Sequence, residues 1–118
     1  MMIKDLIQEF RQQNGKLPAR IDHYEEDQNC LWHCHHMANI QEVCHSPELP
    51  RQRNGYILSE ACAGRSFAHN PNETLRAIIF EQFTNSPEHK EIILMDSLAC
   101  AYYMDFAHHF IYVTIRGW

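Results

Sequence analysis

The segment Asn85-Ser86-Pro87-Glu88-His89 predicts the start of a late helix and places a histidine in its first turn. Serine is a favoured N-cap residue, and proline suits the first helical position, where no amide donor is required. The apolar run at positions 92–94 supplies a helix face that can pack against a core. Because the positive end of a helix disfavours an imidazolium, we expect the His89 ring to stay neutral and to keep one nitrogen for a proton or a metal ion.

The residues around this segment predict a helix before it and a hairpin after it. Positions 70–73, Asn-Pro-Asn-Glu, have the same cap and proline pattern and start a further helix. The apolar face of this helix comprises Leu75, Ile78, Ile79 and Phe83. The β-rich runs 97–104 and 110–116 are separated by only a short turn, so they predict an antiparallel hairpin.

Two more helices are expected in the N-terminal half. Apolar residues recur at helical spacing over positions 3–10, and Asn14-Gly15 supplies a left-handed stop. Asp22 and Glu25 have the spacing of a capping box, so a second helix is expected to run from there to about Ile40.

A long polar loop and a strand follow the second helix. Between positions 43 and 55 the composition turns to Pro, Ser, Arg, Asn and Gly, which marks a surface loop of the kind that carries functional sites. Residues 56–63 then alternate as a strand does, and Glu60 lies within this run. A carboxylate within a strand either lies at an exposed edge of the sheet or has a functional role.

The predicted order is helix, helix, strand, helix, helix, strand, strand. It indicates an α+β fold with a mostly antiparallel sheet flanked by helices on both faces. The length of 118 residues and the ordinary apolar fraction of 45% fit a single domain spanning residues 1–118.

Charge and hydropathy argue against several classes of partner. The net charge is −5 and the basic residues do not cluster, so we expect no nucleic-acid partner. No apolar run approaches the ~20 residues of a membrane span. The first ten residues resemble an amphipathic helix and lack the pattern of a signal peptide, so no export signal is expected in the chain as given.

The chain has five cysteines, which are Cys30, Cys34, Cys44, Cys62 and Cys100. Their number is odd and none forms a CxxC pair, so we expect reduced thiols, with Cys30 and Cys34 packed on a helix face. His33, His35 and His36 lack the four-residue spacing of a helical zinc pair. Chelation by Cys30 and Cys34 with a flanking histidine is the open alternative.

Three motifs together suggest a family. In the first motif, the second helix carries Met37-Ala38 and leads to a loop with His45-Ser46. The second motif is Ser-Glu-Ala at residues 59–61. The third is Phe-Thr-Asn-Ser-Pro-Glu-His at residues 83–89. In this order and spacing they resemble the CAP superfamily, also called the SCP domain, and its short bacterial-type members above all. The resemblance spans nearly the whole chain. Ala61 replaces the asparagine of the family's Gly-Glu-Asn, and Phe83 replaces its usual tryptophan.

This resemblance implies an α-β-α sandwich whose central cleft gathers two histidines and acidic residues, in some members around zinc or another divalent cation. By position, the metal-binding histidines are His45 and His89. The further cleft candidates are Glu60, Ser86, Glu81 and Glu88. Glu60 matches a family acid directly, whereas Glu81 and Glu88 are only neighbours of the place where the second acid is expected.

Three functions are compatible with these residues. The resemblance favours a non-catalytic module that binds a small molecule, lipid, peptide or protein, and it implies a secreted or extracytoplasmic location. A metal-assisted hydrolase is the alternative, in which His45 and His89 hold the ion and Glu60 is the general base. The third is a thiol or metal sensor that uses the cysteines and the neighbouring histidines.

Overall fold

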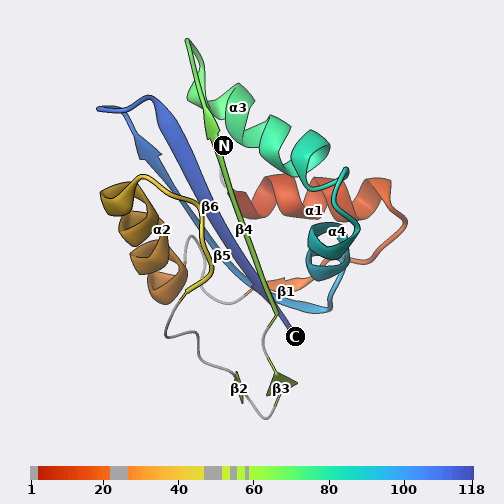
Figure 1. Cartoon of the computed structure of the whole chain (residues 1–118). Helices are drawn as coiled ribbons and strands as arrows, with labels where there is room; N and C mark the ends of the chain where they lie inside the picture. Colours follow the sequence, from red (N-terminus) through yellow and green to blue (C-terminus); the bar gives the residue numbers. More distant parts are fainter. Residues whose placement is uncertain (1–2, 22–26, 47–51, 54–55, 58) are drawn as a thin grey trace.

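The computed structural model describes residues 3–21, 27–46, 52–53, 56–57 and 59–118 (Figure 1). The helical segments are α1 (Ile3–Gln13), α2 (Gln28–Ile40), α3 (Pro71–Ala77), the π-helix η1 (Ile78–Gln82) and α4 (Pro87–Ile93). The strands are β1 (Arg20–Ile21), β2 (Gln52–Arg53), β3 (Tyr56–Ile57), β4 (Ser59–Ser66), β5 (Ser97–Asp105) and β6 (Phe110–Gly117). The α+β class expected from the sequence is confirmed.

The main sheet has the strand order β1-β5-β6-β4. The predicted hairpin is present as β5 and β6, and β4 pairs antiparallel with β6. The two-residue strand β1 pairs parallel with β5, so the sheet is mixed. In the β4–β6 register, Glu60 lies directly opposite Arg116.

Alternating side chains of the strands build two separate hydrophobic clusters. We call the first the apolar face; α1, α3, η1 and α4 cover it, and its sheet residues are Ala61, Ala63, Leu98, Cys100, Ile111, Val113 and Ile115. We call the second the α2 face; it comprises Cys30, Cys34, Met37, Ala38, Cys62, Ala99, Ala101 and Tyr112. Figure 1 shows α2 on one side of the sheet and the other helices on the opposite side.

The second helix starts later than the sequence indicates. The proposed capping box at Asp22 and Glu25 lies outside the described residues, and α2 begins at Gln28. Asp27 is its N-cap, because this carboxylate accepts hydrogen bonds from the amides of Asn29 and Cys30. The helix ends at Ile40, as predicted, and Gln41 follows in the left-handed conformation.

The predicted third helix is divided into α3 and η1. Asn70 caps α3 as expected, by accepting from the amides of Asn72 and Glu73. Over η1 the helix widens, and the amide of Phe83 bonds the carbonyl of Ile78, five residues earlier. The predicted apolar residues of both segments are nevertheless buried, including Phe83 at 0% exposure.

Strand β4 lies at an edge of the main sheet and begins three residues later than the predicted strand. Glu60 and Cys62 are both buried on it. A Cβ atom added at Gly64 would lie 2.7 Å from a methyl group of Val43 and 2.5 Å from the Phe110 ring. Glycine at this position therefore lets the segment after α2 pass close to β4, and that segment carries His45.

Candidate functional site

The carboxylate of Glu60 is the centre of a polar network on β4. Its side chain is 1% exposed, and it accepts hydrogen bonds at both oxygens. Oε1 accepts from His45 Nδ1 and from the Ser46 amide, each at 2.9 Å. Oε2 accepts from the Ser46 hydroxyl at 2.8 Å and from Arg116 Nε at 3.0 Å.

Glu60 is held as an anion. Burial by itself would raise the pKa of this carboxyl group. The hydrogen bonds from the amide and hydroxyl of Ser46, from His45 and from Arg116 lower it more strongly, to a pKa of about 2. At neutral pH the group is therefore ionised and has little affinity for a proton.

Arg116 joins four parts of the molecule. Besides Glu60 it donates to the Ser46 hydroxyl at 2.8 Å and to the side-chain oxygen of Asn29. It thereby links β6 to β4, to the loop after α2 and to the first turn of α2. The Arg116 side chain is 3% exposed, so its charge is compensated by these partners and not by water.

His45 is oriented by Glu60 and presented to solvent. A carboxylate can only accept, so in neutral His45 the Nδ1 carries the proton and Nε2 keeps its lone pair. The side chain is 71% exposed. An imidazole whose one nitrogen donates to a carboxylate has the arrangement that metal-binding histidines use to fix the tautomer and increase ligand basicity.

His89 lies at the third position of α4, beyond Pro87, and is half-buried. Its ring packs edge-on against Phe83, with 5.1 Å between centroids. Burial lowers the pKa of His89, and the charge of protonated His45 lowers it further, whereas Glu88 acts in the opposite direction. The neutral ring expected from the sequence is thus favoured mainly by burial and by its neighbour.

The other three cleft candidates differ in their surroundings. Ser86 is the N-cap residue of α4, but its side chain makes no capping hydrogen bond. Glu88 is exposed and acts on His89 electrostatically. Glu81 is exposed and forms a salt bridge with Arg65 at 3.3 Å, so a surface cation already pairs with it.

A second group of possible metal ligands is buried and includes Glu60. Ligand atoms of His33, Glu60 and Cys62 lie within 4.8 Å of one another, and these three buried residues could hold a metal ion. His33 Nε2 contacts the Cys44 carbonyl at 2.7 Å. His33 Nδ1 is buried and has no hydrogen-bond partner among the described residues, which costs about 1–3 kcal/mol for a polar atom.

The five cysteines form no disulfide bond with one another within the described residues, and their thiols are poorly suited to reaction as thiolates. Cys30, Cys34, Cys62 and Cys100 are buried, while Cys44 is half-buried. Burial strongly raises the pKa of Cys30 and Cys62, and the charge of Glu60 raises that of Cys62 further. Burial also raises the pKa of Cys44.

Sequence reasoning missed three contributors to this site. Asn29 and Arg116 are far apart in the sequence, and their link to Glu60 becomes visible only through the strand register. The register of β4 on β6, which places Arg116 opposite Glu60, is set by the fold and not by a turn between the two strands. His33 is 0% exposed, so the buried face of α2 includes this polar residue in addition to the expected Cys30 and Cys34.

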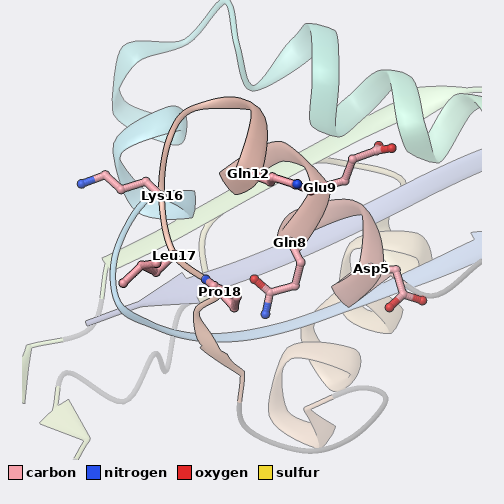
Figure 2. A pocket seen from close by; sticks show the side chains of 7 residues that line it. All are labelled: Asp5, Gln8, Glu9, Gln12, Lys16, Leu17 and Pro18. Carbon is pink, nitrogen blue, oxygen red and sulfur yellow. The ribbon is translucent and has the colours of Figure 1, made fainter.

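A hollow of about 600 Å³ lies elsewhere, against α1 and the link to β1. Figure 2 shows its lining residues, which are Asp5, Gln8, Glu9, Gln12, Lys16, Leu17 and Pro18. The Gln8 amide bonds both the carbonyl and the amide of Ala19, so its polar groups are used to fix the link. The lining contains none of the site residues indicated by the sequence.

The comparisons with known proteins inform the fold. No family model matches the sequence, and no curated protein matches it. Among solved structures, an outer surface protein from Borrelia burgdorferi is similar, with a TM-score of 0.72 over 98% of this chain and 88% of that one. The two sequences are 17% identical, so the likeness is one of fold. Within the described residues, the helices are all too short or too polar to cross a membrane.

Proposed function

We propose that this protein is a CAP/SCP-like, non-catalytic binding module whose recognition site is built around His45, Glu60 and His89. The observation that carries the proposal is the 2.9 Å bond between His45 Nδ1 and Glu60 Oε1, because it fixes an exposed imidazole with its second nitrogen available. The order of His45-Ser46, Glu60 and Ser86-Pro87-Glu88-His89 along the sequence, which resembles that of the CAP superfamily, supports the family part of the proposal.

The recognition site binds a divalent cation, Zn²⁺ in particular, through His45 and His89. Burial favours the neutral form of His89, and neutral imidazole is a good zinc ligand. Glu60 does not bind the ion in this proposal; it accepts the Nδ1 proton of His45 and so orients that ring. The remaining positions on the metal are open to a group of the ligand, which is a small molecule, lipid, peptide or protein.

The hydrolase alternative is less well supported. A general base needs a pKa near the working pH and a lone pair within reach of water. Glu60 has a pKa of about 2, and its oxygens already accept from His45, Ser46 and Arg116. The sensor alternative needs an accessible thiol with a lowered pKa, whereas burial raises the pKa of Cys30 and Cys62.

An extracytoplasmic location belongs to the same proposal. The family resemblance favours it, and the Borrelia protein is named as an outer surface protein. Fractionation of the producing cells and detection of the native chain with an antibody would test this part separately from the chemistry of the site.

Zinc titration by calorimetry tests the recognition site directly. Protein without a histidine tag, freed of metal with a chelator, is compared with the double variant His45→Ala, His89→Ala. We expect the variant to bind one zinc equivalent less per chain. The control is His35→Ala, His69→Ala, since both of these histidines are exposed. The proposal is contradicted if the first variant binds as much zinc as the wild type.

A further inference from the structure

We infer that His33, Cys62 and Glu60 form a second, buried zinc site, distinct from the exposed histidines of the recognition site. It joins α2 to β4 from inside the α2 face. Imidazole nitrogen, thiolate sulfur and carboxylate oxygen are the three ligand types that proteins offer to Zn²⁺. The inference does not depend on the function proposed above, because its zinc ligands are not His45 and His89; Glu60 would be a ligand here, whereas in the recognition site it only orients His45.

The tautomer of His33 points to a ligand. Its Nε2 lies 2.7 Å from the Cys44 carbonyl, and a carbonyl can only accept, so Nε2 carries the proton. The lone pair is then on Nδ1, which is buried without a hydrogen-bond donor among the described residues. Metal-binding histidines commonly donate their other N–H to a backbone carbonyl in this way.

Cys62 and Glu60 supply the remaining charge. Besides burial, the negative charge of Glu60, which lies close to Cys62, raises the pKa of the Cys62 thiol, whereas the Thr114 hydroxyl lowers it. Zinc would take the place of the thiol proton, which passes to solvent, and would lie between the Cys62 sulfur and a Glu60 oxygen. Arg116 keeps its hydrogen bond to Glu60 Oε2. The site therefore already has one positive charge beside the bound ion.

The separation of the ligand atoms fits a site that closes slightly on binding. Zinc bonds of 2.0–2.3 Å in a tetrahedral arrangement place neighbouring ligands roughly 3.4–3.8 Å apart. The three atoms lie within 4.8 Å of one another, so side-chain movements of about 1 Å are sufficient. Because His33 also holds the Cys44 carbonyl, a bound ion would fix the segment that carries His45.

Cobalt substitution distinguishes this site from the exposed one. Co²⁺ bound to a thiolate gives a sulfur-to-metal charge-transfer band in the near ultraviolet, and Co²⁺ bound to histidines alone does not. Metal-free protein without a tag is titrated with Co²⁺, and Zn²⁺ is then added to displace it. We expect the band in the wild type and in His45→Ala, His89→Ala, and we expect Zn²⁺ to abolish it.

The variants assign the sulfur. Cys62→Ser should remove the band and weaken zinc binding at this site by more than roughly a hundredfold, the upper range for loss of an outer-shell partner alone. Cys100→Ala is the control, because Cys100 is also a buried strand thiol but lies on the apolar face, and it should keep the band. A band that persists in Cys62→Ser would overturn the assignment.

X-ray absorption of the zinc-loaded wild type requires no variant to fold. One sulfur in the zinc coordination shell supports the buried site, and a shell of nitrogen and oxygen alone overturns it. If the buried site does not exist, the variant His45→Ala, His89→Ala should still bind one zinc equivalent less than the wild type. Failure of the recognition site likewise leaves the charge-transfer band in place, so the two outcomes are separable.

Discussion

The two faces of the sheet are covered by different kinds of side chain. The apolar face is filled with large aliphatic and aromatic side chains from four helical segments, including Ile3, Leu6, Ile79, Phe83 and Ile93. The α2 face has one covering helix, small alanines and thiols, and at its margin the network of Glu60, Arg116, Ser46 and Asn29. The difference indicates that the first face is held by apolar packing, whereas the second also positions charged and polar groups.

Neighbouring residues of one strand offer the sharpest comparison. Ile115 points into the apolar face, whereas Arg116, the next residue of β6, bonds Glu60 beside the α2 face. Both are nearly fully buried, so their replacement should destabilise the fold in both cases. The two effects should differ in their dependence on pH, since only Arg116 compensates a charge.

The largest effect is expected for Arg116→Met. This change leaves the Glu60 carboxylate buried without its cation and should lower the free energy of unfolding by about 3–5 kcal/mol at pH 7. Urea unfolding followed by circular dichroism measures it. The double variant Glu60→Gln, Arg116→Met should lose less than the sum of the single changes. Additive losses would show that the two side chains do not act as a pair.

Ile115→Ala should cost about 2–5 kcal/mol through the cavity it leaves in the apolar face. No ionisable group changes, so the curve of stability against pH should be displaced downward and stay parallel to that of the wild type. The same urea experiment, repeated from pH 7 to pH 3, provides the check. A change in the shape of the curve would mean that the two faces are energetically coupled.

Glu60 should make stability depend on pH. Its pKa falls from an ordinary 4.5 to about 2 in the folded protein, so its contribution is present above pH 4.5 and is lost as the pH falls from 4.5 to 2. The difference corresponds to about 3 kcal/mol. Glu60→Gln should remove this part of the acid dependence. An acid transition of unchanged size in the variant would assign it to other carboxyl groups.

The smallest effects concern two helix starts that look alike in sequence. Asn70→Ala removes the bonds to the amides of Asn72 and Glu73 and should cost about 1 kcal/mol. Ser86→Ala should cost less than half of that, because the Ser86 side chain makes no capping bond. Thermal unfolding of both variants tests the difference. Equal losses would indicate that Ser86 caps α4 in solution.

The sequence predicts what local pattern controls. Helical spacing identifies α1, the cap and proline pattern identifies the starts of α3 and α4, and β-rich runs identify the hairpin. Strand β1 is not predicted, because a two-residue element carries no periodicity and depends on its pairing with β5. The π-helix η1 is also missed, since its apolar residues keep the spacing of an ordinary helix.

The candidate site is predictable only in part, because local patterns identify its residues but not the long-range contacts between them. His45, Glu60 and His89 could be singled out by residue type and motif order, and the bond of Glu60 to His45 lies among them. The role of Glu60 could not be predicted, because it depends on Arg116, which pairs with it across 56 residues of sequence. The free lone pair of His33 likewise depends on a backbone carbonyl brought in by the fold.

Nitrogen-15 NMR of the imidazole rings tests the central claim most directly. In metal-free protein at neutral pH, we expect His45 to carry its proton on Nδ1, facing Glu60, and we expect the Nε2 signal to move when Zn²⁺ is added. Glu60→Gln should weaken both features. A proton on Nε2, or an Nε2 signal that zinc leaves unchanged, would contradict the proposal that Glu60 holds His45 ready to bind.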